Sequence, residues 1–436
     1  MITIPNAPRY LVRDLRVPVD LAPSLASRAG PDGLAACEIE IAEGRIARLT
    51  PAREPLLGDL PTVDGRGGLV LPRFVDMHTH LDKGHIVGRA PNPDGTFLGA
   101  RTAVMADRQA NWSEADVRRR MDFALRSAFA HGTGAIRTHL DTYPGQMEIT
   151  WPVFAEARES WRGRIALQAV ALFPYEVAAD DEPLFRSIVE VVVRHGGVLG
   201  AVTHLGAPPD AKLELALDRL FGAAAAHGLD LDFHVDESAS PDARSLERIA
   251  EAALRHRFRG RIVAGHCCSL ALMPEPEMDR VIAKVGEAGI AVVSLPMCNM
   301  YLQDRQPGRT PRWRGVAPLH ELDAAGVTVA VASDNTRDPF YAYGDLDMLE
   351  VFREATRICH LDHSDRPWTR LLGATAAEVM GLGGYGAIAE GGPANLVLTS
   401  ARTLGELVTR PQTDRTVLVA GRPIDTAPPG YRELDG

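Results

Sequence analysis

The sequence is poor in cysteine, and its cysteines follow no recognisable pattern. There are five in 436 residues, and their spacing matches neither a zinc finger nor a CxxC motif. An odd number without a framework spacing favours free thiols in a reducing compartment, so we expect a cytoplasmic protein. The opening segment MITIPNAPRYLVRD lacks the charged and apolar regions of a secretory signal, which agrees with that expectation.

Long apolar runs and an excess of positive charge are also missing. No stretch reaches the about 18 apolar residues that a membrane-spanning helix needs, so we expect no membrane partner. Lys and Arg number 47 against 57 Asp and Glu, which gives a net charge of −10. Without a basic stripe, we do not expect binding to nucleic acid. What remains is an ordinary globular composition, 45% hydrophobic and 24% charged.

The two ends of the sequence share a β-rich pattern. Residues 38–49, EIEIAEGRIARL, alternate apolar and polar side chains around a Glu-Gly turn, which predicts a β-hairpin. Residues 391–399 (GGPANLVLT) and 415–424 (RTVLVAGRPI) are typical of short strands with turn residues. We therefore expect a small β-sandwich domain built from both termini, residues 1–66 and 386–436.

Between the two ends, short apolar runs alternate with amphipathic segments. Residues 113–132 predict one such helix, with a Ser-x-x-Asp capping box at Ser113 and an end near Gly132. Strands that alternate with helices form a parallel sheet, and eight such units close into a barrel. The expected fold is α/β, a (β/α)8 TIM barrel over residues 67–385. The eight apolar runs are 74–80, 134–142, 164–174, 196–204, 228–237, 261–269, 289–298 and 326–335.

Chemically capable side chains gather at the C-terminal ends of these runs, where barrel enzymes build their active sites. His78 and His80 flank a single residue, so in an extended strand they point to the same side. A His-x-His pair alone is a weak signal. Together with His234 near the end of the fifth run and Asp334 near the end of the eighth, it predicts a site for one divalent metal ion, zinc or iron.

The motif HVDE places a carboxylate, Glu237, three residues after His234. A carboxylate beside an activated water is able to collect its proton and deliver it to a leaving group. Asp334 is a second candidate acceptor for that proton, and His266 on the sixth run is a candidate hydrogen-bond partner of the attacking water. If Glu237 protonates an exocyclic amine, the product is ammonia.

The chain resembles the amidohydrolase superfamily, and within it the cytosine-deaminase-like branch, along nearly its whole length. The likeness rests on LPRFVDMHTHLDK, GAIRTHLD, LQAVALFP, GAVTH, DFHVDE, AGHCCS, MCNMYLQDR and ASDNTRDPFYAYG. The last of these segments is also similar to the N-isopropylammelide amidohydrolases. The resemblance implies a (β/α)8 barrel with a β-sandwich from both termini.

The same resemblance implies roles for individual residues. Glu237 corresponds to a proton-shuttling glutamate, and His266 to a histidine beside the attacking water. Hydantoinase-like relatives use a lysine on the fourth strand to bridge two metals, and the run VLGAVTH has none, which favours a single ion. The implied ligands of that one divalent ion, zinc or iron, are His78, His80, His234 and Asp334.

Three positions depart from the cytosine-deaminase pattern around the substrate. The family's glutamine after Phe-Pro is replaced by Tyr175 (or Pro174, depending on one gap), a second carboxylate by Asn335, and a tryptophan by Phe340. A buried ring edge without its amide partner is costly. We therefore expect a deaminase of an aminated N-heterocycle, which leaves cytosine-like pyrimidines, pterins and triazines open.

Two other functions stay open. One is a hydrolase that cleaves a cyclic amide or an N-alkyl-substituted triazine on the same metal. The other is a non-enzymatic scaffold, against which the intact His-x-His, His-x-x-Glu and Asp334 argue. Ammonia release, ring opening or alkylamine release distinguishes the first two, and an absence of bound metal would favour the third.

Some pocket assignments also stay open. Lys83 is a candidate partner of a carboxylate at the barrel mouth, and His204 either contacts substrate or bonds a neighbouring loop. His139 and Asp141 are expected to form a polar layer below the site.

Residues 88–112 predict a long Gly- and Pro-rich loop, either a lid or a surface or subunit contact. A homo-oligomer is compatible with this sequence.

Overall fold

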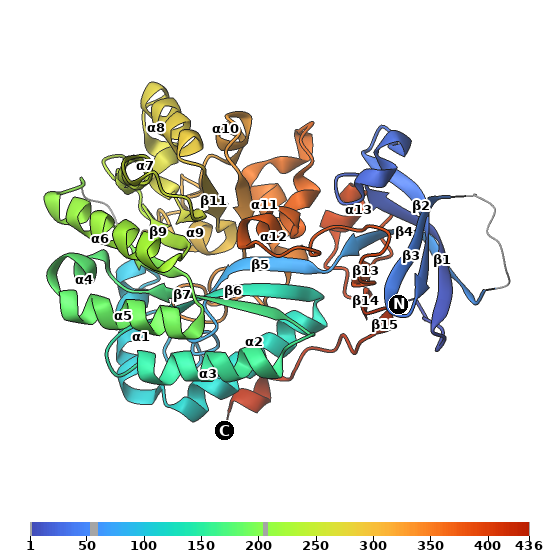
Figure 1. The fold of residues 1–436 in the computed structure, drawn as a ribbon, viewed down its shortest axis with the longest axis horizontal. Helices are drawn as coiled ribbons and strands as arrows, with labels where there is room; N and C mark the ends of the chain where they lie inside the picture. The colour runs from blue at the N-terminus through green and yellow to red at the C-terminus, as the bar shows by residue number, and fades with distance from the viewer. Residues whose placement is uncertain (1, 53–59, 204–207, 436) are drawn as a thin grey trace.

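The chain combines a terminal β-sheet with a larger body of alternating strands and helices (Figure 1). The computed structural model describes residues 2–52, 60–203 and 208–435. The terminal sheet contains segments from both ends of the chain, as the sequence predicts. Within the described residues, none of the helices has both the length and the apolarity needed to cross a membrane.

The terminal sheet has seven strands in the order β15-β14-β13-β4-β1-β2-β3. The predicted hairpin is confirmed, because β2 and β3 pair antiparallel around Glu43 and Gly44, which both have positive φ. The short strands predicted at 391–399 and 415–424 are confirmed as well. The strands are β1 (Arg9–Pro18), β2 (Leu34–Ala42), β3 (Arg45–Pro51), β4 (Thr62–Pro72), β13 (Leu396–Leu398), β14 (Thr416–Val419) and β15 (Arg422–Pro423).

The prediction of eight central strands is confirmed, because each predicted run overlaps a strand. Wherever two of these strands pair, they are parallel. They form a three-stranded sheet, β5-β6-β7, and a five-stranded sheet, β12-β11-β10-β9-β8. Isolated parallel bridges join β7 to the β8 segment, at Val170–Val198 and Pro174–Val202. Another joins Thr79 to Asp334, beyond β12. The strands are β5 (Phe74–Thr79), β6 (Thr133–Asp141), β7 (Ala166–Leu172), β8 (Leu199–Val202), β9 (Leu231–Val235), β10 (Ile262–His266), β11 (Ile290–Ser294) and β12 (Val329–Val331).

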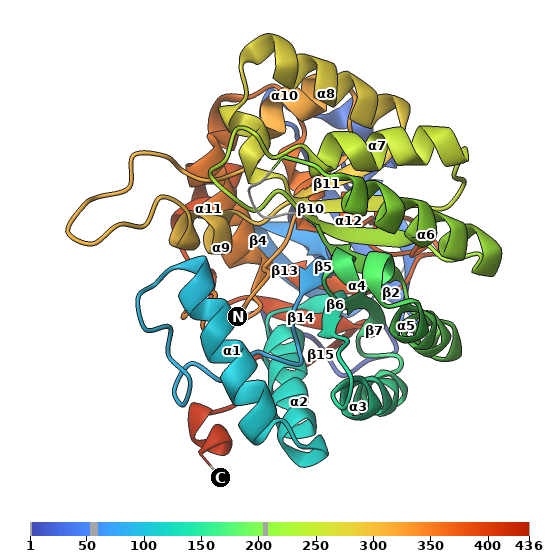
Figure 2. The same cartoon turned by 90° about the vertical axis from the view of Figure 1, so that its left-hand side faces the viewer.

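Helices lie around the central strands (Figure 2). The helix predicted at 113–132 is α2, and its capping residue Ser113 accepts a hydrogen bond from the backbone N–H of Asp116. The α-helices are α1 (Phe97–Asn111), α2 (Glu114–Ala130), α3 (Met147–Ser160), α4 (Tyr175–Asp180), α5 (Glu182–His195), α6 (Ala211–His227), α7 (Ser245–His256), α8 (Glu275–Glu287), α9 (Pro296–Leu302), α10 (Leu319–Ala324), α11 (Met348–Cys359), α12 (Ala374–Met380) and α13 (Leu404–Thr409). Short 3-10 helices are η1 (Pro23–Arg28), η2 (Cys268–Leu272), η3 (Leu361–His363), η4 (Trp368–Leu372) and η5 (Tyr431–Leu434).

The expectation of a structureless loop at 88–112 is wrong, because most of it is helix α1. Pro91, Pro93 and Gly95 break the chain before the helix, but Thr96 caps it by accepting a hydrogen bond from the backbone N–H of Gly99. The capping residue directly follows these helix-breaking residues. Because proline and glycine are the stronger signal in the sequence, they favour the prediction of a loop. The segment thus brings a helix face, rather than a loop, to the ends of the central strands.

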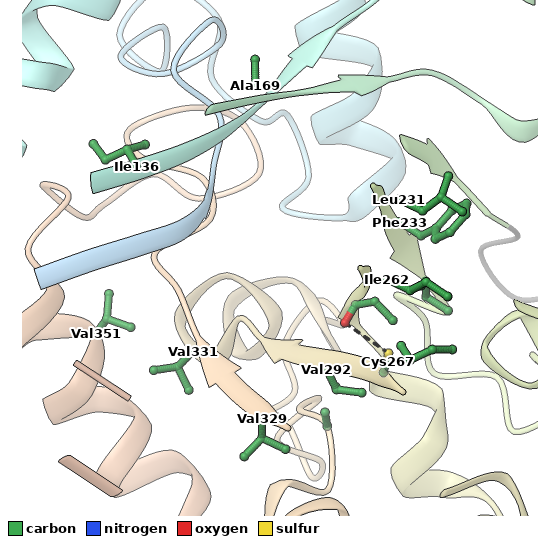
Figure 3. Packing of buried hydrophobic residues seen from close by; sticks show 14 of the residues in the cluster. Ile136, Ala169, Leu231, Phe233, Ile262, Cys267, Val292, Val329, Val331 and Val351 are labelled. Atoms are coloured by element: carbon green, nitrogen blue, oxygen red, sulfur yellow. Dashed lines mark hydrogen bonds between the residues drawn. The ribbon is translucent and has the colours of Figure 1, made fainter. Parts of the chain in front are cut away.

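Apolar side chains of the central strands form the main core. Figure 3 shows Phe233, Val292, Val331 and their neighbours on adjacent strands, with Val351 of α11 packed nearby. A separate cluster of buried residues, including Val12, Ile39 and Leu396, packs the terminal sheet. Arg73 is the single residue that separates β4 from β5 along the chain, so one nearly continuous run of strand leaves the terminal sheet and enters the central body.

Candidate active site

The ends of several central strands bend sharply where the candidate residues lie. His266 at the end of β10 has φ 71°, and Asp334, just beyond β12, has φ 64°. Left-handed backbone is costly for residues other than glycine and persists where surrounding contacts enforce it, which is common at functional sites. The bends bring side chains from different strands together at one pole of the molecule.

Four of the predicted residues converge on one point. The Nε2 atom of His234 lies 3.2 Å from that of His78 and 3.3 Å from that of His80. Asp334 Oδ1 lies 3.2 Å from His80 Nε2 and 3.6 Å from His78 Nε2. One ligand atom from each of the four residues falls within a span of 4.8 Å, and all four side chains are buried.

The chemistry of these donors fits a divalent cation. Burial lowers the pKa values of His78, His80 and His234 well below the usual range, so the three imidazoles are neutral and offer lone pairs. Both carboxylate oxygens of Asp334 are buried without a hydrogen-bond partner among the described residues. Neutral imidazoles and a carboxylate are the ligands that zinc and ferrous iron accept. Neutral imidazole nitrogens and a carboxylate buried this close together are costly unless a cation lies between them.

Glu237 lies beside this cluster in a buried network with His266 and Asn299. The Nδ2 atom of Asn299 donates to Glu237 Oε1 at 3.2 Å and to His266 Nδ1 at 2.9 Å. Burial, and then the neighbouring charge of Asp334, raise the pKa of Glu237 well above its usual range. Burial also raises the pKa of Asp334 to about 7 and lowers that of His266 to about 3. Glu237 is therefore set to carry a proton, and His266 to stay neutral.

A cavity of about 720 Å³ opens over these groups. His80, His234, Glu237, His266 and Asp334 all line it, so the predicted metal ligands and proton-transfer residues reach one common space. The volume lies within the range of about 300–1,000 Å³ that is typical of small-molecule sites. A small organic substrate is therefore able to lie directly against the buried cluster.

One wall of the cavity comes from α1, which presents Phe97, Arg101, Met105 and Arg108. Arg108 also donates to Asp141 Oδ2 at 2.8 Å. Because α1 belongs to the segment between β5 and α2, a residue range expected to be a loop supplies part of the binding surface.

Lys83 has the carboxylate partner that the sequence suggests. Its Nζ lies 2.8 Å from Asp141 Oδ1 and 5.7 Å from the centre of the Phe340 ring. Burial opposes the charge of Lys83, but Asp141 and Asp82 raise its pKa above the usual range. Lys83 and Asp141 thus form a charged pair in the cavity wall, so Asp141 belongs to the site itself rather than to a layer below it.

The other predicted pocket residues divide into three cases. Tyr175 and Phe340 line the cavity. Asn335 also lines it, but its Nδ2 donates to Asp338 Oδ2 at 2.6 Å, so part of its side chain is committed to holding the following turn. His204 lies outside the described residues.

A buried polar layer lies next to the His and Asp cluster. Arg137 Nη1 donates to Asp232 Oδ2 at 2.9 Å, and His139 Nε2 lies 3.8 Å from Asp232 Oδ1. The ring of His139 packs against that of His78, with 4.0 Å between centroids, and His78, His139 and Asp232 could themselves form a ligand group. The sequence places His139 in such a layer. Its partner Asp232 was missed, although it stands two residues before His234 and therefore on the same side of β9.

Asn299 is the second residue that sequence reasoning missed. It lies in the quoted segment MCNMYLQDR, immediately after the seventh run, so its position at a strand end was the available signal. An asparagine there is also typical of an ordinary turn. Only the tertiary structure brings it against Glu237, just beyond β9, and His266 of β10, which are 62 and 33 positions away in sequence.

Comparison with known proteins agrees with this geometry. Residues 126–425 match the model of the amidohydrolase family. The pterin deaminase of Rhizobium rhizogenes is 54% identical over 433 residues, covering 99% of this chain and 97% of the relative. Among solved structures, the 5-methylcytosine deaminase of Klebsiella pneumoniae has a TM-score of 0.80 at 27% identity, covering 95% of this chain and 97% of the other.

A third relative is named for a different reaction. The N-isopropylammelide isopropylaminohydrolase of Burkholderia multivorans superposes with a TM-score of 0.74 at 27% identity, covering 96% of this chain and 98% of the other. The resemblance expected from the sequence motifs is therefore confirmed at the level of the whole chain. The chain belongs to the amidohydrolase family and is a hydrolase of carbon–nitrogen bonds other than peptide bonds.

Proposed function

We propose that the protein is a metal-dependent hydrolytic deaminase that releases ammonia from a pterin or a closely related aminated N-heterocycle. The observation that carries the proposal is that the buried carboxyl group of Glu237 lines the same cavity as the His and Asp cluster. The pterin deaminase that is 54% identical over 99% of the chain supports the choice of ring.

The proposed metal centre holds one divalent ion per chain, zinc or iron. His78, His80, His234 and Asp334 would hold it, since their donor atoms are buried and converge. When bound, the ion would supply Lewis-acid activation of water at neutral pH. The chain's own groups then have to orient that water and move its protons.

The roles proposed for these groups follow from their positions. Asp334 accepts a proton from the attacking water, and His266 offers its Nε2, which has no partner among the described residues, to orient it. Glu237 protonates the ring nitrogen beside the reacting carbon as the carbon–oxygen bond forms. The ionised Glu237 then takes the proton of the new hydroxyl group and gives it to the amino group, which leaves as ammonia as the exocyclic carbon–nitrogen bond breaks, and the proton held by Asp334 restores Glu237. A ring carbonyl remains, so water has replaced ammonia with no other reactant.

The cavity walls are suited to a flat ring. Phe340 and Tyr175 offer aromatic surface, and Lys83 carries a positive charge above the Phe340 ring. We include Tyr175, Asn335, Phe340 and Lys83 as substrate-binding residues, with His204 as a further candidate. Because none of these reproduces the pattern that selects cytosine, a larger ring than cytosine is favoured.

The alternative is hydrolysis of a cyclic amide or an N-alkyl-substituted triazine on the same centre. A relative named for an N-isopropylammelide reaction keeps this alternative open at 27% identity. Glu237 argues against it, because a buried acid that carries a proton suits the protonation of a ring nitrogen and an amine.

We further propose how the fold frames the site. The two central sheets act as one closed (β/α)8 barrel, since parallel bridges join them at both seams. The terminal strands act as a β-sandwich domain of residues 1–66 and 386–436, beside a catalytic barrel of 67–385. The proposed boundary after residue 66 falls inside β4, so the two parts share a strand.

Ammonia release is the decisive measurement. Zinc- or iron-loaded protein is incubated with pterin, cytosine, 5-methylcytosine, an aminopurine and N-isopropylammelide, and ammonia and isopropylamine are quantified. We expect ammonia from pterin together with the corresponding ring carbonyl product. Isopropylamine from the ammelide, without ammonia from any substrate, would establish the alternative.

A Glu237→Gln protein in parallel controls for contaminating deaminases. It keeps the shape of the side chain but does not carry the exchangeable carboxyl proton. Equal ammonia release by the two proteins would mean either a contaminating deaminase or no proton transfer by Glu237, and a His234→Ala protein distinguishes the two, because only a contaminant would leave its ammonia release unchanged.

A further inference from the structure

Helix α9 places an amide between two residues of the proposed proton path. It begins at Pro296, directly after β11, and Asn299 lies in its first turn with no solvent exposure. Gln303, at the end of the same helix, donates its Nε2 to the backbone carbonyl of Glu237 at 3.4 Å. One short helix thus contacts both the main chain and the side chain of Glu237.

The two amide hydrogens of Asn299 have two different acceptors. Its Nδ2 lies 3.2 Å from Glu237 Oε1 and 2.9 Å from His266 Nδ1. A primary amide nitrogen has two N–H groups, so both bonds are satisfied together. The structure directs the amide nitrogen, and not the amide oxygen, toward both of these atoms.

This arrangement determines which nitrogen of His266 carries the proton. A neutral imidazole has one N–H, and a ring nitrogen that accepts a hydrogen bond cannot also carry it. Because Asn299 donates to Nδ1, the proton lies on Nε2. That atom is buried and has no partner among the described residues, and His266 lines the cavity. The ring therefore presents a hydrogen-bond donor to whatever enters.

A competing arrangement is close at hand. His266 Nδ1 also lies 3.4 Å from Glu237 Oε1. Without Asn299, the ring is free to carry its proton on Nδ1 and to donate it to that carboxyl group. Nε2 would then face the cavity as an acceptor, and Glu237 would be held by the imidazole instead of being available to the substrate.

We propose that Asn299 is a positioning residue that fixes the Nε2–H tautomer of His266 and keeps that imidazole from capturing Glu237. The inference rests on the proposed deaminase function and adds a residue to it. Asn299 does not line the cavity, so it acts through its two partners and not by contact with the substrate.

The direct test is the tautomer itself. Zinc-loaded protein labelled with ¹⁵N-histidine is studied by NMR, and the His266 signals are identified by their loss in His266→Gln. We expect a proton on Nε2 in the wild type and on Nδ1 in Asn299→Ala. A wild-type proton on Nδ1, or an unchanged tautomer in Asn299→Ala, would overturn the proposal. No substrate is needed, so this result stands apart from the outcome of the ammonia assay.

Kinetics supply the second test. Asn299→Ala should lower kcat about 10- to 100-fold, as losses of orienting partners commonly do. It should leave KM within about threefold and the metal content at the wild-type level. Asn299→Asp keeps the size of the side chain but removes both N–H donors, so it should behave like the alanine variant. If it keeps the wild-type kcat, packing and not hydrogen-bond donation is the role of this position.

A double-mutant cycle separates positioning from general damage. In a His266→Gln background, adding Asn299→Ala should cost little further activity, because the imidazole whose tautomer it fixes and which it keeps from Glu237 is gone. Fully additive losses would contradict the proposal. Asn395→Ala is the control, since the Asn395 side chain also forms a hydrogen bond, accepting one from the backbone N–H of Ala420, but lies beside β13 in the terminal part of the chain. It should leave kcat and the His266 tautomer unchanged.

Discussion

The terminal sheet and the central strands are both β structure, but they bury opposite kinds of side chain. The terminal sheet encloses an apolar cluster that includes Val12, Ile39 and Leu49, and its buried acidic residue Glu40 is paired with the largely exposed Arg9. The central strands bury imidazoles and carboxylates whose polar atoms often have no protein partner, His78 and Asp334 among them. Unpaired buried polar groups lower stability unless a ligand satisfies them. The terminal sheet is thus built for stability, and the ends of the central strands for chemistry.

The largest effect should come from removing a proposed metal ligand. In His234→Ala, three proposed donor residues remain, and they would hold a cation less tightly beside the buried carboxylate of Asp334. We therefore expect metal content and ammonia release to fall to background. Metal analysis beside the activity assay tests this. Full metal occupancy in the variant would remove His234 from the ligand set.

Glu237→Gln should separate metal binding from chemistry. The change removes a proton carrier but leaves the cluster, so turnover should fall about 10²- to 10⁴-fold while metal content stays at the wild-type level. Activity and bound metal are measured on the same preparation. A variant that retains turnover would exclude Glu237 from proton transfer.

A core substitution in the terminal sheet should lower the stability of the protein and leave its catalysis unchanged. Leu49 is buried in that sheet's apolar cluster, so Leu49→Ala should lower the free energy of unfolding by about 2–5 kcal/mol while folded enzyme keeps its kcat. Denaturant unfolding of metal-loaded protein gives the stability. Leu215, which is 44% exposed on α6, provides the matched control, because Leu215→Ala should shift stability far less. A large loss of kcat in Leu49→Ala would break the contrast between the two regions.

The smallest effect is expected where the two regions meet. His131 at the end of α2 lies 2.7 Å from Asp345, and the nearby Asp347 pairs with Arg415, just before β14. Burial opposes the charge of His131, but Asp345 and Asp347 raise its pKa above the usual value. A raised folded-state pKa stabilises the protein below the unfolded-state value near 6.5, and this contribution is lost as pH rises through the folded-state value.

Replacement of that histidine tests the sign of the effect. His131→Asn should therefore destabilise the protein below pH about 6.5 by roughly 1 kcal/mol or less, and by less still at pH about 8. Unfolding midpoints at the two pH values measure this. A loss that is greater at the higher pH would contradict the assigned ionisation.

Much of this organisation could be predicted from the sequence, because it depends on local periodicity. Eight apolar runs with intervening helices gave the order of the central strands, and the polar ends of the runs located His78, His80, His234 and Asp334. Strand alternation also indicated which side chains share a face.

The residues that were missed depend on long-range contacts. Asp232 meets Arg137 across 95 positions, and Asn299 meets Glu237 across 62, and neither pairing has a local signature. Helix α1 was missed for a different reason, since Pro91, Pro93 and Gly95 precede its capping Thr96. Proline and glycine indicate where a helix or strand ends, but not how soon the next one begins.

The nearly continuous run from β4 through Arg73 into β5 has a consequence for engineering by recombination. Residues 62–79 belong to the terminal sheet at one end and carry His78, a proposed metal ligand, near the other. Parts exchanged between relatives should therefore not be joined within this stretch, because a junction there would disturb the position of His78. A chimaera that exchanges terminal sheets should keep residues 62–79 from the parent that supplies the pocket, and place its crossover before β4.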